Sequence, residues 1–244
     1  IDSNYASQYG GGTYYSNLIN CNIHHNNSDY SGGGSYYGNA TNCIFSHNTS
    51  YYYGGGKDNG TTYNSTFSQN HAQYGGAASN GTIYHSDFRE NSANYYGGAI
   101  YNLTCYYSII SNNIASNYGG GAHAGTTNSC LFTNNSANYG GGASSATVRN
   151  CTFSNNYAST NGGGTYSGSI YNSILWGNRT ANGDNQYYSG SFYYSAIQGI
   201  LVSGSGNIQL SANNYGNEVG IHYVRFEDPV NENYRLQYGS SCIN

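Results

Sequence analysis

The sequence predicts an all-β protein: a right-handed parallel β-helix solenoid of about ten rungs, with about 22 residues in each rung. Two observations predict this fold. An apolar residue recurs at that interval, and an asparagine follows it three residues later every time. The apolar column comprises Ile1, Ile23, Phe45, Phe67, Phe88, Ile110, Phe132, Phe153 and Leu175, and Ile197 continues it with Ile200 in place of the asparagine. The asparagines are Asn4, Asn26, Asn48, Asn70, Asn91, Asn113, Asn135, Asn156 and Asn178.

One rung illustrates how the elements follow from the residues. Cys151 and Phe153 are two residues apart, so they share one face of a strand, while Thr152 faces away. The turn comes where Tyr139 precedes a glycine triplet, 140–142, and the same tyrosine–glycine pairing recurs in other rungs. No segment shows the periodicity that an α-helix requires. Short strands, small inward residues and glycine corners therefore predict the coils of a parallel β-helix.

The two columns are predicted to lie inside the solenoid. Each buried Phe or Ile of the apolar column contributes about 1.5–3 kcal/mol to folding. The asparagines are expected to form an inward amide ladder at a turn, bonding to backbone and to the next rung. The alternative, a stripe of asparagines that binds a ligand, is the weaker interpretation.

The chain is predicted to be one domain with two regions. Residues 1–181 are regular rungs, of which the first is incomplete at Ile1; either residues before Ile1 were cleaved or a neighbouring subunit completes the rung. Residues 182–244 are expected to form modified final rungs and a polar C-terminal cap, which solenoids need for solubility. The charged residues of the cap are Glu218, Arg225, Glu227, Asp228, Glu232 and Arg235.

Composition excludes several classes of function. Only 7% of residues are charged and the net charge is −4, so no basic surface exists to hold nucleic acid. No apolar run is long enough to span a membrane. The abundance of Asn, Ser, Gly and Tyr, with almost no Lys, favours an extracellular or cell-surface location.

The cysteines present two alternatives. Cys21 and Cys43 lie on adjacent rungs, as do Cys130 and Cys151, at a Cα separation that permits a disulfide. Cysteine is also a good small core residue, and buried thiols are favoured here. No Cys-x-x-Cys pair occurs, so a zinc site of that type is not expected.

No catalytic, cofactor or metal site is predicted. The seven histidines are expected to share no column, and the His24–His25 doublet is interpreted as a solvated strand edge. The carboxylates Asp58 and Asp87 fall at different offsets within their rungs, whereas polysaccharide lyases and hydrolases need clustered carboxylates. Asp87 and Arg89 are interpreted as a surface ion pair.

The repeat resembles that of a known family. Gly-Gly-Ala occurs at 75–77, 97–99 and 141–143, and Phe-x-x-Asn at 67–70, 88–91 and 153–156. This pairing is similar to the repeats of chlamydial polymorphic outer-membrane proteins and of secreted bacterial and archaeal right-handed β-helix proteins. The end of the chain, 226–244, resembles how many of the latter close their helix. The resemblance implies surface display and adhesion, with no shared site.

Tyrosine is the unexplained excess, with 31 residues that come largely in clusters. Exposed tyrosines are rigid, amphipathic contact residues. The sequence therefore favours a non-enzymatic extracellular structural protein that assembles head-to-tail with copies of itself into a filament, sheath or surface layer. The alternative is a cell-surface adhesin or a carbohydrate-binding or carbohydrate-cleaving β-helix, with glycans or neighbouring surface proteins as partners.

Overall fold

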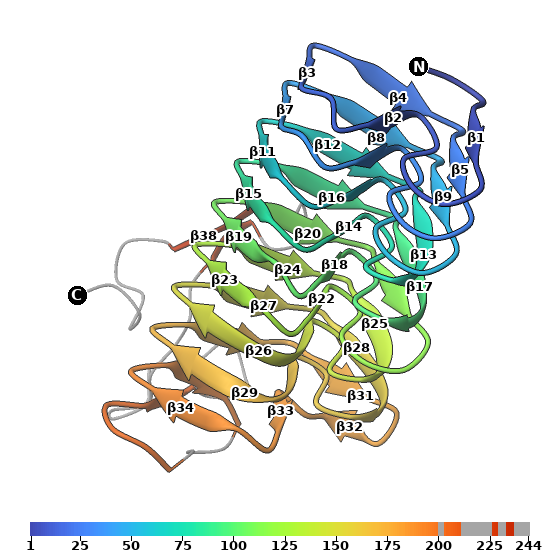
Figure 1. Ribbon diagram of the computed structural model, residues 1–244. Coiled ribbons are helices and arrows are strands. Elements are labelled where there is room, and N and C mark those ends of the chain that lie inside the picture. Colours follow the sequence, from blue (N-terminus) through green and yellow to red (C-terminus); the bar gives the residue numbers. More distant parts are fainter. Residues whose placement is uncertain (200–202, 211–225, 229–232, 237–244) are drawn as a thin grey trace.

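The computed structural model describes residues 1–199, 203–210, 226–228 and 233–236. Over these residues the protein is a parallel β-helix with about nine turns of about 22 residues, and the described part contains no α-helix. The turns stack from β1–β4 at the N-terminal end to β34 and β32 at the other end (Figure 1). The fold class predicted from the sequence is confirmed.

Three sheets run along the stack, each built from one or two short strands per turn. The first sheet contains β1 (Tyr5–Ala6), β5 (Asn27–Ser28), β9 (Thr49–Ser50), β13 (His71–Tyr74), β17 (Ser92–Tyr96), β21 (Ile114–Ala115), β25 (Ser136–Tyr139), β28 (Tyr157–Asn161), β31 (Arg179–Thr180) and β32 (Gly183–Asp184).

The second sheet has two strands in most turns, and the seven-residue β26 and β29 join the two columns into one sheet. Its first column contains β2 (Thr13–Tyr14), β6 (Ser35–Tyr36), β10 (Lys57–Asp58), β14 (Ala78–Ser79), β18 (Ile100–Tyr101), β22 (Ala122–His123) and β33 (Tyr187–Tyr188). The joining strands are β26 (Ala143–Arg149) and β29 (Thr165–Tyr171). Its second column contains β3 (Leu18–Ile19), β7 (Ala40–Thr41), β11 (Thr61–Tyr63), β15 (Thr82–Tyr84), β19 (Thr104–Tyr106), β23 (Thr126–Asn128) and β34 (Ser191–Tyr193).

The third sheet carries the apolar column. It contains β4 (Asn22–His24), β8 (Ile44–Ser46), β12 (Thr66–Ser68), β16 (Asp87–Arg89), β20 (Ile109–Ser111), β24 (Leu131–Thr133), β27 (Thr152–Ser154), β30 (Ile174–Trp176), β35 (Ala196–Gln198) and β36 (Ile208–Leu210). Its strands pair in parallel and in register, so that Phe67 lies between Phe45 and Phe88.

The C-terminal region departs from this regularity. β31 and β32 pair antiparallel, as do β37 (Phe226–Asp228) and β38 (Asn233–Leu236), which form a separate two-stranded sheet. Of the predicted cap, Glu218, Arg225 and Glu232 lie outside the described residues, as does Cys242. The cap therefore stays a prediction.

The core is the apolar column of the third sheet together with small residues of the second. From Ile23 to Ile197 every residue of the predicted column has no exposed surface, and the phenylalanine rings stack, with 4.8 Å between the centroids of Phe45 and Phe67. Ile1 is the exception. The prediction that it is a core residue is wrong, because at the end of the stack it is covered from one side only and remains 43% exposed.

The corners depend on left-handed backbone at non-glycine residues. Tyr15, Asn20 and His25 have φ near +54° in the first turn, and the same three corners repeat in the turns that follow. Left-handed residues break the alternation of a strand, so a corner residue and the strand residue before it can both face outward.

The glycine triplets mark a close approach between turns. A Cβ atom at Gly33 would lie 2.2 Å from the carbonyl oxygen of Thr49, and Gly10 has φ of +64°. Only glycine fits both requirements. The triplet therefore lets the chain reverse sharply between the first and second sheets.

Candidate binding surface of stacked tyrosines

The glycine turn places two columns of aromatic side chains face to face. The first column precedes the triplets, and the second lies on the strands that follow them, β2 to β33. The first column contains Tyr9, Tyr53, Tyr74, Tyr96, Tyr118 and Tyr139, and the second contains Tyr14, Tyr36, Tyr101, His123, Tyr166 and Tyr188. We call these two columns the tyrosine seam. Its rings interlock across the turn, with centroids 4.5 Å apart for Tyr9–Tyr36 and 5.2 Å for Tyr139–Tyr166.

The seam contains one buried carboxylate. Asp58 occupies the second column, where it accepts hydrogen bonds from the hydroxyls of Ser31 and Ser79 and from Nδ2 of Asn80. Three donors satisfy the charge without a cation. No sequence pattern points to this network, because Ser31 lies one turn before Asp58 and Ser79 and Asn80 lie one turn after it.

Lys57, the residue before Asp58, points into the solenoid interior. Its ammonium donates to the carbonyl oxygens of Tyr37, Gly38 and Asn59 at 3.3, 2.8 and 2.6 Å. Burial lowers the pKa of Lys57 to about 8, although Asp58 opposes that shift. Lys57 is therefore a structural residue that closes a corner, and its ammonium is not available to a ligand.

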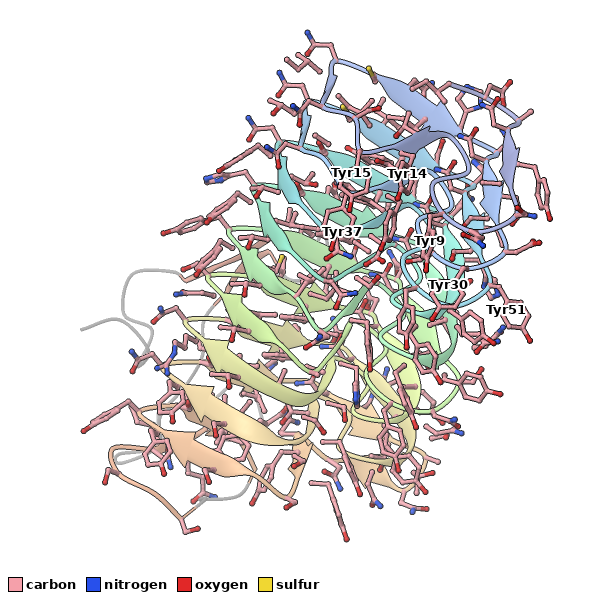
Figure 2. The ribbon with its side chains drawn as sticks, viewed as in Figure 1. Tyr9, Tyr14, Tyr15, Tyr30, Tyr37 and Tyr51 are labelled. Atoms are coloured by element: carbon pink, nitrogen blue, oxygen red, sulfur yellow. The ribbon has the colours of Figure 1, made fainter. Side chains whose placement is uncertain are left out.

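Near the N-terminal end the aromatic side chains reach the surface. The tyrosine surface, as we define it, comprises Tyr9, Tyr14, Tyr15, Tyr30, Tyr37 and Tyr51. Figure 2 shows Tyr14, Tyr15 and Tyr37 gathered below β2, with Tyr9 and Tyr30 beside them and Tyr51 at the outer edge. Tyr14, Tyr15 and Tyr51 are 55%, 61% and 57% exposed.

The exposed rings are held in place by one another. Tyr15 and Tyr37 stack in parallel with centroids 4.7 Å apart, and Tyr14 stacks on Tyr36 at 5.6 Å. The left-handed corners at Tyr15 and Tyr37 explain why both members of a pair such as Tyr14–Tyr15 face solvent. Strand alternation predicts only that at least one does. The recurrence of Tyr-Tyr one turn apart, at 14–15 and 36–37, was the available signal for a corner column.

An open hollow of about 520 Å³ adjoins this surface. It is lined by Tyr5, Ala6, Ser7, Gln8, Tyr9 and Tyr14. The lining offers ring faces, hydroxyls and an amide, and it contains no charged side chain. This chemistry suits a neutral ligand that has both apolar faces and hydroxyl groups.

Burial shifts the pKa values of two rings of the seam. Burial, with a smaller contribution from Asp58, raises the pKa of Tyr36 to about 12. Burial lowers the pKa of His123 to about 4, so it acts as a neutral ring between Tyr96 and Tyr101, at 4.7 and 5.8 Å. Both rings are therefore uncharged over the physiological pH range.

The asparagine column is a continuous ladder of hydrogen bonds. At each step the side-chain oxygen of one asparagine accepts from the backbone N–H and from Nδ2 of the asparagine one turn earlier, as at Asn91 and Asn70, both 3.0 Å. Nδ2 also donates to a carbonyl of the apolar column, as Asn91 does to Phe67. All members but Asn4 are buried, and the ladder continues from Asn178 to Gln186, which sequence reasoning missed because Gln186 stands outside the spacing.

The small residues two positions before the apolar column, serine or cysteine in each turn, form a second ladder of hydrogen bonds that the sequence did not predict. Backbone N–H groups donate to side chains one turn later, from Ser65 to Ser86 at 3.1 Å and from Cys130 to the sulfur of Cys151 at 3.3 Å. The structure has free thiols at Cys21, Cys43, Cys105, Cys130 and Cys151. Burial raises the pKa of Cys151, so this thiol is inert in a column that serine and cysteine share.

The histidines are arranged differently from the prediction that they share no column. His25 and His47 both lie two residues after the apolar column, and their rings stack at 4.9 Å. His24 and His25 lie beside Asp2 of the preceding turn.

The other carboxylates lie apart from the tyrosine surface or at its margin. Asp87 forms an ion pair with Arg89 on the surface of β16. Asp29 accepts a hydrogen bond from the hydroxyl of Tyr5.

Three segments of the chain match the Chlamydia polymorphic membrane protein repeat, at residues 85–103, 129–143 and 150–168. No curated protein shows significant similarity to the chain. Among solved structures, a crystal structure of a TibC-catalysed hyper-glycosylated TibA fragment matches at 16% identity. The match covers 86% of this chain and 94% of that one, with a TM-score of 0.19. A score this low carries no argument about function.

In the described part of the chain, no helix has the length and apolar character needed to cross a membrane. The matched segments each run through the corners and strands of the regular turns, from β16 to β29. They coincide with the columns that build the solenoid. The chain is thus a parallel β-helix in which three segments of the regular turns are similar to the Chlamydia polymorphic membrane protein repeat.

Proposed function

We propose that this chain is a non-enzymatic, cell-surface protein of the adhesin type that binds neutral glycans through the tyrosine surface. The observation that carries the proposal is the set of exposed rings in which Tyr15 stacks on Tyr37 and Tyr14 stacks on Tyr36, with the exposed ring of Tyr51 at the edge of the same surface (Figure 2). The match to the Chlamydia polymorphic membrane protein repeat supports the surface location.

The chemistry of the surface favours a neutral sugar over other ligands. Sugar rings present C–H faces that pack on aromatic rings, and hydroxyls that pair with tyrosine hydroxyls and with amides. The adjoining hollow supplies Ser7 and Gln8 for such pairing. No cationic side chain lines the hollow, so acidic polysaccharides have no partner charge there.

The rings also have little freedom to lose on binding. Tyr15 lies parallel to Tyr37 with an interplanar angle of 1°, and the backbone at both residues is held by hydrogen bonds to the next turn, from Tyr15 N–H to the oxygen of Tyr36 and from Tyr37 N–H to that of Asp58. Such preorganisation lowers the entropic cost of association. Rings that are already fixed can therefore bind a ligand even when each ring makes only a few contacts with it.

The test is retention of the protein by neutral and acidic polysaccharides in affinity electrophoresis. We expect wild type to be retarded by a neutral polysaccharide. Replacing Tyr14 and Tyr15 together by alanine is expected to weaken binding to that polysaccharide at least about tenfold, which corresponds to about 1.4 kcal/mol. The matched control replaces Tyr106 and Tyr107, an adjacent pair whose second residue also has left-handed backbone but lies at another corner of the turn. Equal binding by the Tyr14/Tyr15 variant and wild type would contradict the proposal.

A second proposal is head-to-tail association of copies of this chain. β1, β2, β3 and β4 are the terminal strands of their sheets, and Ile19 on β3 is 67% exposed. Terminal strands with one unpaired edge are templates for another chain. If copies associate there, Ile19→Lys abolishes the concentration-dependent rise in sedimentation coefficient. Ile114→Lys, at an exposed isoleucine in the middle of the stack, leaves that rise unchanged. A sedimentation coefficient independent of concentration in wild type would exclude this association.

A further inference from the structure

One cluster of side chains takes no part in the tyrosine surface. His24 ends β4, His25 occupies the corner that follows, and Asp2 lies one turn earlier, in register with His24. We infer that Asp2, His24 and His25 form a binding site for a divalent transition-metal ion of the Zn²⁺, Ni²⁺ and Cu²⁺ class.

The backbone brings the two adjacent histidines to the same side. Neighbouring residues of a strand face opposite ways, but His25 has φ of +54°, and this left-handed corner ends the alternation. The Nδ1 atoms of His24 and His25 consequently lie 3.0 Å apart. The imidazoles of two residues adjacent in the sequence therefore point toward the same position.

Asp2 completes a triangle of ligand atoms. Its Oδ1 lies 3.1 Å from Nδ1 of His24 and 3.7 Å from Nδ1 of His25. A tetrahedral Zn²⁺ with bonds of about 2.0–2.1 Å holds its ligand atoms about 3.3–3.4 Å apart. The three separations lie on both sides of that value, so shifts of a few tenths of an ångström suffice to coordinate one ion.

Without an ion the cluster is not fully satisfied. If the Nδ1 proton of His24 is donated to Asp2, the lone pair on Nδ1 of His25 has no donor within the cluster. A cation at the centre of the triangle would use all three lone pairs.

The ligands are supported by neighbouring groups. Ser3 donates to Oδ1 of Asp2 at 2.7 Å, and the ring of His25 stacks on His47 of the next turn. Supporting contacts of this kind fix the orientation of metal ligands and strengthen binding. Two imidazoles and one carboxylate suit Zn²⁺, Ni²⁺ and Cu²⁺ better than Ca²⁺ or Mg²⁺, which prefer oxygen ligands.

The site also leaves room for a fourth ligand. The side chains of Asp2 and His25 are 53% and 58% exposed, so water or a side chain of another molecule can complete the coordination. An ion with an open position on an exterior corner can bridge to a partner. Such a site therefore provides a contact point independent of the tyrosine surface.

The experiment is a calorimetric titration of the full chain with ZnCl₂, followed by electron paramagnetic resonance of the Cu²⁺-loaded protein. We expect one Zn²⁺ per chain and a Cu²⁺ spectrum with nitrogen hyperfine structure from two imidazoles. His24→Ala, His25→Ala and Asp2→Asn each weaken Zn²⁺ binding at least about tenfold. Circular dichroism verifies that each variant is folded, and Asp2→Asn keeps the size of an exposed side chain.

The matched control is His85→Ala. His85 is another exposed corner histidine, with φ of +49°, and it stacks on Tyr107 away from the cluster. It is expected to leave Zn²⁺ affinity unchanged. The inference is overturned if wild type binds no Zn²⁺ at tens of micromolar, if Asp2→Asn and His25→Ala bind as wild type does, or if His85→Ala weakens binding equally.

Discussion

Lys57 shows how a single residue departs from the pattern of its column. Its counterparts one turn before and one turn after are Ser35 and Ala78, both small, inward-facing residues. The long side chain is accommodated because its ammonium reaches three corner carbonyls. From the sequence, a lone lysine in a chain of low charge is expected on the surface. Lys57 is buried because β10 pairs with β6 and β14 in a register that turns this residue inward, and the sequence alone does not determine that register.

The buried ammonium predicts a pH dependence of stability. The pKa of Lys57 is about 8 in the folded chain and about 10.5 when unfolded, so between these values only the unfolded chain holds the proton. The free energy of unfolding therefore gains a contribution that rises with pH through this window, by up to about 1.4 kcal/mol per pH unit.

The check compares wild type with Lys57→Met by urea denaturation between pH 7 and 10. Cysteine and tyrosine titrations are common to both proteins and cancel in the difference. We expect the stability of wild type relative to the variant to increase over this range. A difference independent of pH would contradict the burial of the ammonium.

At the scale of the elements, stability resides in columns more than in individual strands. Many strands have only two or three residues, and each is held by its neighbours above and below. The apolar and asparagine columns were predictable because a fixed spacing repeats through every turn. The corners were not, since left-handed backbone occurs at Tyr, His, Asn and Ser alike. The outward pairing of Tyr14 with Tyr15 depends on such a corner.

The asparagine ladder predicts a large cost for removing one step. Asn91 accepts two hydrogen bonds from Asn70 and donates to Phe67, Arg89 and Asn113. Asn91→Ala leaves several buried polar groups without partners, at about 1–3 kcal/mol each. We expect a loss of at least about 3 kcal/mol in the free energy of unfolding, measured by urea denaturation.

Asn94→Ala is the matched control, because Asn94 is an exposed asparagine on β17 in the same turn. Its effect is expected to stay within about 0.5 kcal/mol. Similar losses for the two variants would show that the ladder contributes little beyond the rest of the rung.

The whole molecule combines a regular scaffold with an irregular surface. The repeat and the fold class followed from sequence because each turn obeys the same spacing. The tyrosine surface, the buried Asp58 and the histidine cluster did not, because each depends on contacts between residues of different turns. The scaffold runs through all the regular turns, including those that match the repeat model, whereas the tyrosine surface, Asp58 and the histidine cluster each occupy only a few turns. Specific function is therefore expected in the local groups.

The central claim is that the tyrosine surface binds a neutral glycan. Hydroxyl-radical footprinting read by mass spectrometry tests it most directly, because oxidation of each tyrosine reports its own exposure. When the neutral glycan that retards the protein in affinity electrophoresis is bound, we predict that oxidation of Tyr14, Tyr15 and Tyr51 falls at least severalfold. Tyr107 and Tyr157, which are exposed elsewhere, serve as internal controls and remain unchanged. Protection of Tyr107 or Tyr157 with none at Tyr14 and Tyr15 would contradict the claim.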